Sequence, residues 1–328
     1  MRRVFQIAIA TFSIALVNSC AKSTTFSGNI TTPSGGSIIT NVTYGSNFNW
    51  LGQTEELKLD VYKPTVAGDV ATKHPLVVWI HGGGFLTGDK EAAAKFSTLL
   101  ANKGFVVAPI DYRLGWTKSD TNPCDADTAQ AFEAYYRALQ DTRAAIRYLV
   151  ANAATYGIDT NWIFIGGASA GGVTSLSIPY YTPENYMQYF NSATIAKLGP
   201  LDSDNNLTNT FRIKGIMAMW GAISSPDVIT SQNAVPTIFF HGTDDNVVPF
   251  DVGPFYICPN FQVGYGTKPL YEKLTSLGVP AVAHIEPGGG HGVYTEEFRA
   301  DNSACFLKSL MSKTPEKGYY IGDASSCQ

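Results

Sequence analysis

The sequence predicts an α/β fold in which a mostly parallel central sheet of about eight strands carries helices on both faces. Short runs rich in β-branched residues alternate with longer stretches of helical periodicity, the pattern of successive strand–helix–strand units. Of the 328 residues, 45% are hydrophobic, which is enough to build a substantial core. The chain shows no internal repeat and no second linker, so we expect one folded domain.

The strands are expected where apolar runs are bounded by Gly, Pro, Asn or Asp: residues 57–62, 76–81, 105–111, 162–166, 213–220, 237–241 and 282–286. Helices are expected at residues 91–102, 128–156, directly after Ser169, near 269–277 and at 296–312. Ligands of parallel sheets bind beyond the carboxyl ends of the strands, so the functional residues should lie in the loops that follow strands.

The charge pattern argues against a nucleic-acid partner. The chain has 23 Lys+Arg and 27 Asp+Glu, a formal net charge of −4, and its basic residues are scattered without a run of five like charges.

The N-terminus has the pattern of an export signal. Arg2 and Arg3 precede a mostly apolar stretch at residues 4–17, and small residues follow up to Cys20. The segment 16–20 resembles the lipobox of bacterial lipoproteins, which implies a signal peptide at 1–19 and a lipid on Cys20. Ordinary secretion and an uncleaved anchor are the alternatives.

A tether would follow the signal at residues 20–45, which are rich in Ser, Thr, Gly and Asn, and the catalytic domain would span 46–328. The expected location is therefore the bacterial cell envelope, with the protein held on a membrane by its lipid, or else the periplasm or the medium.

Four further cysteines lie in the expected domain: Cys124, Cys258, Cys305 and Cys327. An even number in an exported chain predicts two disulfides, with three possible connectivities. We favour Cys305 with Cys327, which would join the tail to the last helix, and Cys124 with Cys258 by elimination. Buried free thiols are the alternative. No Cys-x-x-Cys spacing or Cys/His cluster suggests a metal site.

Two glycine-rich loops follow expected strands. Residues 81–85 read His-Gly-Gly-Gly-Phe, a turn whose backbone N–H groups are left free to face an anion. Residues 167–172 read Gly-Ala-Ser-Ala-Gly-Gly between a strand and an apolar helix, the context in which a G-x-S-x-G serine is a nucleophile. Ser169 is therefore the candidate nucleophile.

A serine nucleophile needs a histidine base and an acid to orient it. The chain has five histidines. His81 and His241 belong to strand-end motifs and are expected to brace their loops, whereas His291 stands in a glycine-rich loop after the last expected strand and is the candidate base. The acid should follow a strand between the serine and this histidine, where Asp244 and Asp245 both occur.

These segments resemble the α/β-hydrolase fold, specifically its bacterial esterase and lipase branch with the HGGG motif. In that branch, a His-Gly-x-x-Asp turn carries the acid as its fifth residue, which implies Asp245 here, with Asp244 as the alternative. The resemblance covers about residues 57–310 and implies a serine carboxylesterase. Asp111, Arg113, Asp141 and Arg143 are expected to have structural roles.

The resemblance implies an oxyanion hole formed by the backbone N–H groups of Gly83, Gly84 and Ala170. This chemistry calls for no metal and no organic cofactor. The expected substrates are short-chain or carbohydrate-linked esters of acetyl or feruloyl type.

Residues that follow strand ends are candidates for the substrate pocket: Phe85, Trp116, Trp220 and Tyr294. Residues 177–210 carry five aromatic side chains and form either a small cap over the site or an ordinary helical excursion. A serine peptidase of the prolyl-oligopeptidase type and a non-catalytic binding protein with this fold are the alternative functions.

Overall fold

The computed structural model describes residues 37–64, 66 and 68–327, all within one compact unit of the chain. The predicted signal peptide, Cys20 and the tether up to residue 36 lie outside the described residues. Residues 38–45 were also expected to belong to the tether, but they form most of the first strand, so the folded domain begins earlier than predicted.

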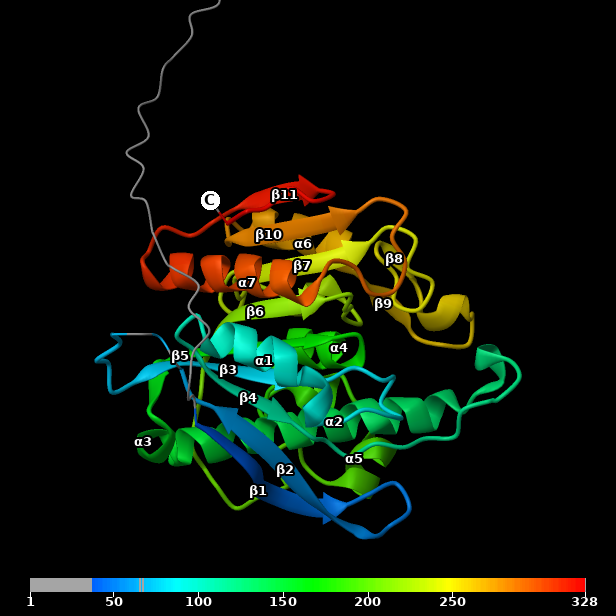
Figure 1. Ribbon diagram of the computed structural model, residues 1–328. Helices are drawn as coiled ribbons and strands as arrows, with labels where there is room; N and C mark the ends of the chain where they lie inside the picture. Colours follow the sequence, from blue (N-terminus) through cyan, green and yellow to red (C-terminus); the bar gives the residue numbers. More distant parts are fainter. Residues whose placement is uncertain (1–36, 65, 67, 328) are drawn as a thin grey trace, which may run out of the picture. The chain divides into compact units, whose positions relative to one another are not determined.

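The central sheet has nine strands among the described residues, in the order β1-β2-β4-β3-β5-β6-β7-β10-β11 (Figure 1). Their bounds are β1 (Ile38–Phe48), β2 (Thr54–Tyr62), β3 (His74–Ile80), β4 (Val106–Ile110), β5 (Ile158–Ala168), β6 (Ile213–Met219), β7 (Thr237–Gly242), β10 (Ala281–Glu286) and β11 (Gly318–Ile321). Strand β2 pairs antiparallel with β1 and β4, and every other pair is parallel. The architecture predicted from the sequence, a mostly parallel sheet with helices on both faces, is confirmed.

The helices are α1 (Ala94–Ala101), α2 (Thr128–Ala151), α3 (Ala153–Tyr156), α4 (Ala170–Ser177), α5 (Ser192–Leu198), α6 (Thr267–Ser276) and α7 (Glu296–Met311). The long helix expected at 128–156 is thus divided at Asn152 into α2 and α3. Two short strands, β8 (Val252–Pro254) and β9 (Val263–Tyr265), pair with each other outside the main sheet.

The helices cover both faces of the sheet (Figure 1). Phe96 of α1 and Phe306 of α7 pack in one hydrophobic cluster with strand residues. Leu139 of α2, Leu176 of α4 and Leu270 of α6 pack in a second cluster. Strand side chains alternate between the two clusters because successive residues of a strand point to opposite faces. The sheet therefore has a hydrophobic cluster on each face. Packing in both clusters holds the strands whose ends carry the site.

A buried ion cluster connects the first strand to α2. Arg113 is 1% exposed and donates to both carboxylate oxygens of Asp141. Its Nε lies 2.8 Å from Oδ1 and 3.2 Å from Oδ2, and its Nη2 lies 2.6 Å from Oδ1. Its Nη2 is also 3.1 Å from Asp204 Oδ1, and its Nη1 donates to the carbonyl oxygen of Phe48 at 3.0 Å. Arg113 and Asp141 have the structural role that the sequence analysis expected.

Both disulfides are formed as favoured from the sequence. Cys124 pairs with Cys258, with Cα atoms 5.1 Å apart, and Cys305 pairs with Cys327, with Cα atoms 5.5 Å apart. The first joins the loop before α2 to the segment between β8 and β9. The second joins the end of the chain to α7.

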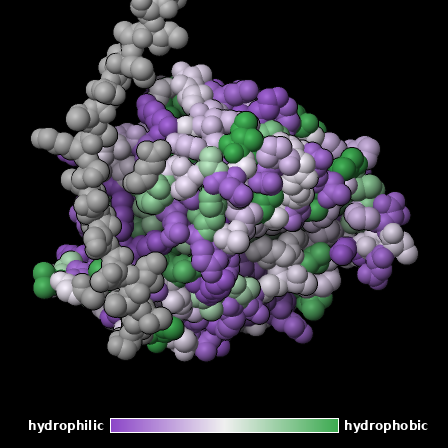
Figure 2. Space-filling view, turned by 45° about the horizontal axis from the view of Figure 1, so that its top comes forward, coloured by the Kyte–Doolittle hydropathy of each residue, from purple (hydrophilic) through white to green (hydrophobic). Residues whose placement is uncertain are grey.

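The surface shown in Figure 2 carries hydrophilic residues interspersed with small separate groups of hydrophobic ones. None of the helices between residues 37 and 327 has the length and hydropathy of a bilayer-spanning segment.

Candidate active site

Ser169 lies on a strained turn between β5 and α4. Its φ of 57° and ψ of −120° are rare for a residue with a side chain, and such strain is typical of functional sites. A Cβ atom at Gly171 would lie 2.0 Å from the carbonyl oxygen of Ile80, and one at Gly172 would lie 2.7 Å from that of Met219. The glycines after the serine are therefore required for α4 to approach the sheet so closely.

His291 contacts both other members of the predicted triad. Its Nε2 is 2.8 Å from Ser169 Oγ, and its Nδ1 is 2.8 Å from Asp245 Oδ2. The histidine lies in the loop after β10, the serine follows β5 and the aspartate follows β7, so the three meet at the carboxyl ends of parallel strands.

The side chain of Asp245 is fully buried and accepts four hydrogen bonds. Its Oδ1 accepts from the backbone N–H groups of Val247 and Val248 at 2.8 and 3.0 Å. Its Oδ2 accepts from His291 and lies 3.2 Å from Nε2 of His241. Burial alone raises the pKa of Asp245, but the hydrogen bonds from the two histidines outweigh burial and hold this pKa below its usual range.

The neighbouring Asp244 does not reach the histidine. Its side chain is exposed and accepts from the hydroxyl of Thr243 at 3.0 Å. Of the two candidates for the acid, the structure brings Asp245 to His291.

In the glycine-rich loop after β3, the backbone conformation leaves N–H groups without a hydrogen-bond acceptor in the described part of the chain. Gly83 has a φ of 108°, and a Cβ there would lie 1.9 Å from the carbonyl oxygen of Thr87. Within the described part of the chain, the N–H groups of Gly83, Gly84 and Ala170 donate no hydrogen bond. Gly84 and Ala170 line the same cavity as Ser169, the position expected of oxyanion donors.

His81 braces this loop, as expected from the sequence. Its Nδ1 is 2.7 Å from the carbonyl oxygen of Gly82, and its ring stacks on Tyr112 with centroids 4.3 Å apart. Burial lowers the pKa of His81.

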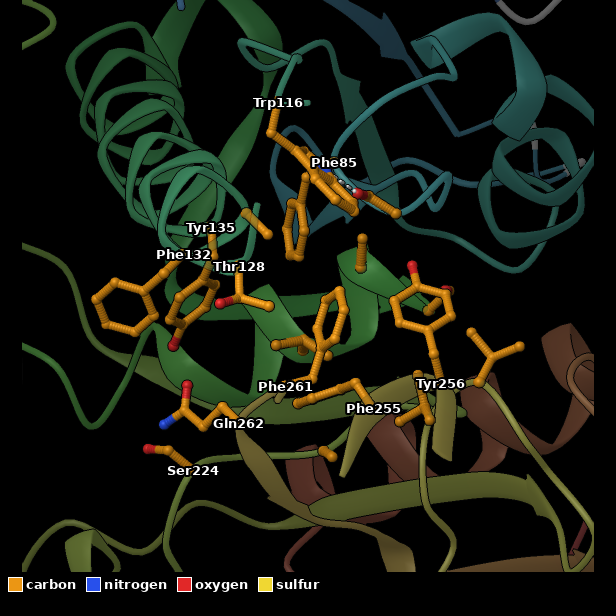
Figure 3. A pocket seen from close by; sticks show the side chains of 18 of the residues that line it. Phe85, Trp116, Thr128, Phe132, Tyr135, Ser224, Phe255, Tyr256, Phe261 and Gln262 are labelled. Atoms are coloured by element: carbon orange, nitrogen blue, oxygen red, sulfur yellow. Dashed lines mark hydrogen bonds between the residues drawn. The ribbon is translucent and has the colours of Figure 1, made fainter. Parts of the chain in front are cut away.

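An apolar cavity of about 110 Å³ opens beside Ser169 (Figure 3). Its aromatic wall comes from four segments: the loop after β3, the loop after β4, helix α2, and the segment around β8 and β9. The aromatic residues are Phe85, Trp116, Phe132, Tyr135, Phe255, Tyr256 and Phe261. Thr128, Ser224 and Gln262 add side-chain polar groups. Two of the four residues predicted for the pocket, Phe85 and Trp116, therefore line it.

The other two predicted pocket residues, Trp220 and Tyr294, do not line the cavity. Both have positive φ angles, 40° and 62°, and pack in the cluster on the α7 face of the sheet. The Trp220 ring lies 6.1 Å from the ring of His291 and beneath the guanidinium of Arg299, and Tyr294 stacks on Phe298. The prediction was wrong for these two because their side chains pack in this hydrophobic cluster instead of at the cavity.

Residues 177–210 form the ordinary helical excursion rather than a cap. Tyr180, Tyr181 and Tyr186 are buried, and the ring of Phe190 meets that of Tyr136 on α2 at 4.9 Å. None of these residues lines the cavity.

Residues 252–265 supply the wall that sequence reasoning missed. The signal in the sequence was the cluster of Phe255, Tyr256 and Phe261 around Cys258, a cysteine that pairs with a residue just ahead of α2.

Among the described residues, no group of three His, Cys, Asp or Glu side chains is arranged to hold a metal ion.

The BD-FAE family model matches residues 59–223. Carboxylesterase 3B of Mus musculus is 36% identical over 124 residues, 37% of this chain and 20% of that protein. Neuroligin-like protein glit-1 of Caenorhabditis elegans is 30% identical over 138 residues, 42% of this chain and 17% of that protein. The matches thus span about a fifth of these relatives.

Among solved structures, a truncated form of a carbohydrate esterase from gut microbiota superposes with a TM-score of 0.58 and 21% identity. The superposition covers 86% of this chain and 98% of that one, and it supports the fold.

Proposed function

This chain belongs to the BD-FAE family, and we propose that it is a serine carboxylic-ester hydrolase acting through Ser169, His291 and Asp245. The observation that carries the proposal is the hydrogen-bond chain from Asp245 through His291 to Ser169, beside an apolar cavity and two loops with free N–H groups. The similarity to a carboxylesterase supports it.

In the proposed reaction, Ser169 Oγ attacks the ester carbonyl carbon while Nε2 of His291 takes the hydroxyl proton. The oxyanion accepts hydrogen bonds from the N–H groups of Gly83, Gly84 and Ala170, and loss of one such donor costs ~10²–10³ in turnover. The alcohol then leaves with the proton from the histidine. Water hydrolyses the acyl-enzyme with the same histidine as base, which releases the acid.

Asp245 holds the imidazole in the tautomer that leaves Nε2 free to accept a proton. Its low pKa keeps the carboxylate charged throughout the neutral range, where it stabilises the imidazolium formed during each step.

The cavity favours an ester with a small acyl group. A cavity of ~150 Å³ lined by apolar side chains binds benzene in another protein, and the cavity here measures about 110 Å³. This volume suits acetyl and other short-chain acyl groups, and the aromatic side chains of its wall offer ring faces against which part of a feruloyl-type group would stack. The fold shared with a carbohydrate esterase supports a carbohydrate as the alcohol half.

Export and lipid anchoring through Cys20 are part of the proposal. The sequence pattern of residues 1–20 supports them, and the two disulfides fit an oxidising compartment. Incorporation of a labelled fatty acid in cells, lost in Cys20→Ser, tests the anchor.

The activity is tested by hydrolysis of p-nitrophenyl acetate, butyrate and decanoate. We expect the short esters to be hydrolysed and Ser169→Ala to be inactive, while Ser175→Ala remains active. Ser175 is a matched control because it lies in α4, which begins directly after Ser169, and its hydroxyl donates to the Gly172 carbonyl oxygen. A folded wild-type protein without activity above Ser169→Ala would instead favour a binding protein with this fold.

A further inference from the structure

A second histidine contacts the carboxylate of Asp245. His241 is the penultimate residue of β7 and is fully buried. Its Nε2 lies 3.2 Å from Asp245 Oδ2 and 3.1 Å from the carbonyl oxygen of Val248. On the other side of the ring, Nδ1 lies 2.9 Å from the hydroxyl of Thr267, the fully buried first residue of α6.

The hydrogen-bond partners decide which nitrogen of His241 carries a hydrogen. A carboxylate and a backbone carbonyl can only accept, so Nε2 must donate. Nδ1 is then free to accept from the hydroxyl of Thr267. Oδ2 of Asp245 therefore accepts from two imidazoles, one from His291 and one from His241.

No further charged side chain is recorded against this pair within the described residues. The electrostatic influences on Asp245 come from the two histidines and the Val248 backbone. On the other elements, His241 meets the ring of Phe250 edge-on at 5.7 Å and pairs in the sheet with Ile285 of β10. The backbone N–H groups of Val247 and Val248 hold Oδ1 of Asp245, whereas the two imidazoles are the partners of Oδ2.

We propose that His241 is a positioning residue of this site, which orients Asp245 through its Nε2–H bond and takes part of the carboxylate's charge. The proposal rests on the proposed function. It extends the hydrogen-bonded chain to five residues, running from Thr267 through His241, Asp245 and His291 to Ser169. His241 itself does not touch the substrate.

The test compares four variants. His241→Leu removes the donor and keeps most of the volume, His241→Gln keeps an amide donor at a similar reach, and Thr267→Val removes only the hydroxyl. His284→Leu is the matched control, because His284 is also fully buried on a neighbouring strand but bonds to Ser326 and stacks on Phe240.

We expect His241→Leu to lower kcat for p-nitrophenyl acetate roughly tenfold with little change in KM, since a hydrogen bond to a charged group is lost. The acidic limb of the kcat/KM profile should move to higher pH by about half to one unit. The direction follows because the carboxylate of Asp245 has two imidazole partners in the wild type and only His291 in His241→Leu. Its charge then acts on His291 alone and stabilises the imidazolium of that residue more strongly than in the wild type.

His241→Gln should restore most of kcat and the wild-type pH profile, and Thr267→Val should fall between wild type and His241→Leu. His284→Leu should lower the melting temperature without moving the profile. The proposal is overturned if folded His241→Leu and His284→Leu have the same pH profile and the same kcat.

A readout without substrate separates this proposal from the proposed function. The NMR resonance of the His291 Nδ1 proton should shift between wild type and His241→Leu, and His284→Leu should leave it in place. If the wild-type protein hydrolyses no ester, the proposed function fails, and the resonance alone then decides the role of His241. An unchanged resonance overturns it.

Discussion

The disulfide between Cys124 and Cys258 should control how the cavity selects its substrate. It joins the loop before α2 to the segment between β8 and β9, and both of these segments supply cavity wall. Asn260 adds a hydrogen bond of 2.6 Å to the carbonyl oxygen of Cys124. The perturbation is the double substitution Cys124→Ser with Cys258→Ser, and its control is Cys305→Ser with Cys327→Ser.

The sequence separations of the two disulfides, 134 and 22 residues, set the expected losses of stability. In the chain-entropy model they correspond to about 5 and about 3.4 kcal/mol at 25 °C. Both variants should therefore unfold at lower urea concentration, and the Cys124/Cys258 variant should lose more. A loss of stability alone would not show that the Cys124–Cys258 disulfide shapes the cavity, because both disulfides contribute to stability.

The distinguishing measurement is the ratio of kcat/KM for an aromatic acyl ester to that for an acetyl ester. Without the Cys124–Cys258 bond, the wall that carries Phe255, Tyr256 and Phe261 loses a fixed point, so KM for the aromatic ester should rise several-fold. The acetyl ester needs little of that wall. If the ratio is the same in wild type and both double variants, the disulfide acts on stability alone and our interpretation of the wall is wrong.

Three further predictions concern the candidate base, the turn that carries the nucleophile and the buried ion cluster. His291→Asn should lower kcat by ~10⁵-fold or more in a protein with wild-type circular dichroism, and residual activity near wild type would remove it as the base. Gly171→Ala should cost about 3 kcal/mol or more in urea unfolding, because the added Cβ would lie 2.0 Å from the carbonyl oxygen of Ile80; an unchanged midpoint would contradict the required close approach. Burial and the nearby charge of Asp141 raise the pKa of Asp204, so the folded state holds a proton that the unfolded state releases, and stability should fall as pH rises above the usual carboxyl range. Asp204→Asn should weaken that fall in urea titrations between pH 5 and 8, and an equally steep fall in the variant would refute the assignment.

The interior of the sheet was predictable from the sequence, whereas its edges were not. Each of the seven expected strands is present. All of them except β2 pair parallel with at least one neighbour, and buried parallel strands are continuous apolar runs. Strand β1 was missed because its polar residues, such as Thr40 and Asn41, are exposed and resemble those of a tether. Strand β11 is a four-residue edge strand in which every second residue is exposed, so its pattern is too short to recognise.

The positions of Ser169, Asp245 and His291 were predictable because each stands in a short motif directly after a strand. The rest of the cavity wall was not predictable from the sequence, because it depends on the directions of side chains and on contacts between residues far apart in the chain. Trp220 packs in the hydrophobic cluster on the α7 face instead of at the cavity, and a disulfide to Cys124 brings in a segment more than a hundred residues away.

The pairing of β8 with β9 has a consequence for how this protein can evolve. Val252 lies opposite Tyr265, so the excursion that carries much of the cavity wall leaves the domain and returns to it at nearly the same point. An insertion, deletion or exchange between these two residues would leave the strand ends that hold the reacting groups in place. Selectivity can therefore diverge between homologues by replacement of this segment together with its disulfide to Cys124, while the chemistry is inherited unchanged.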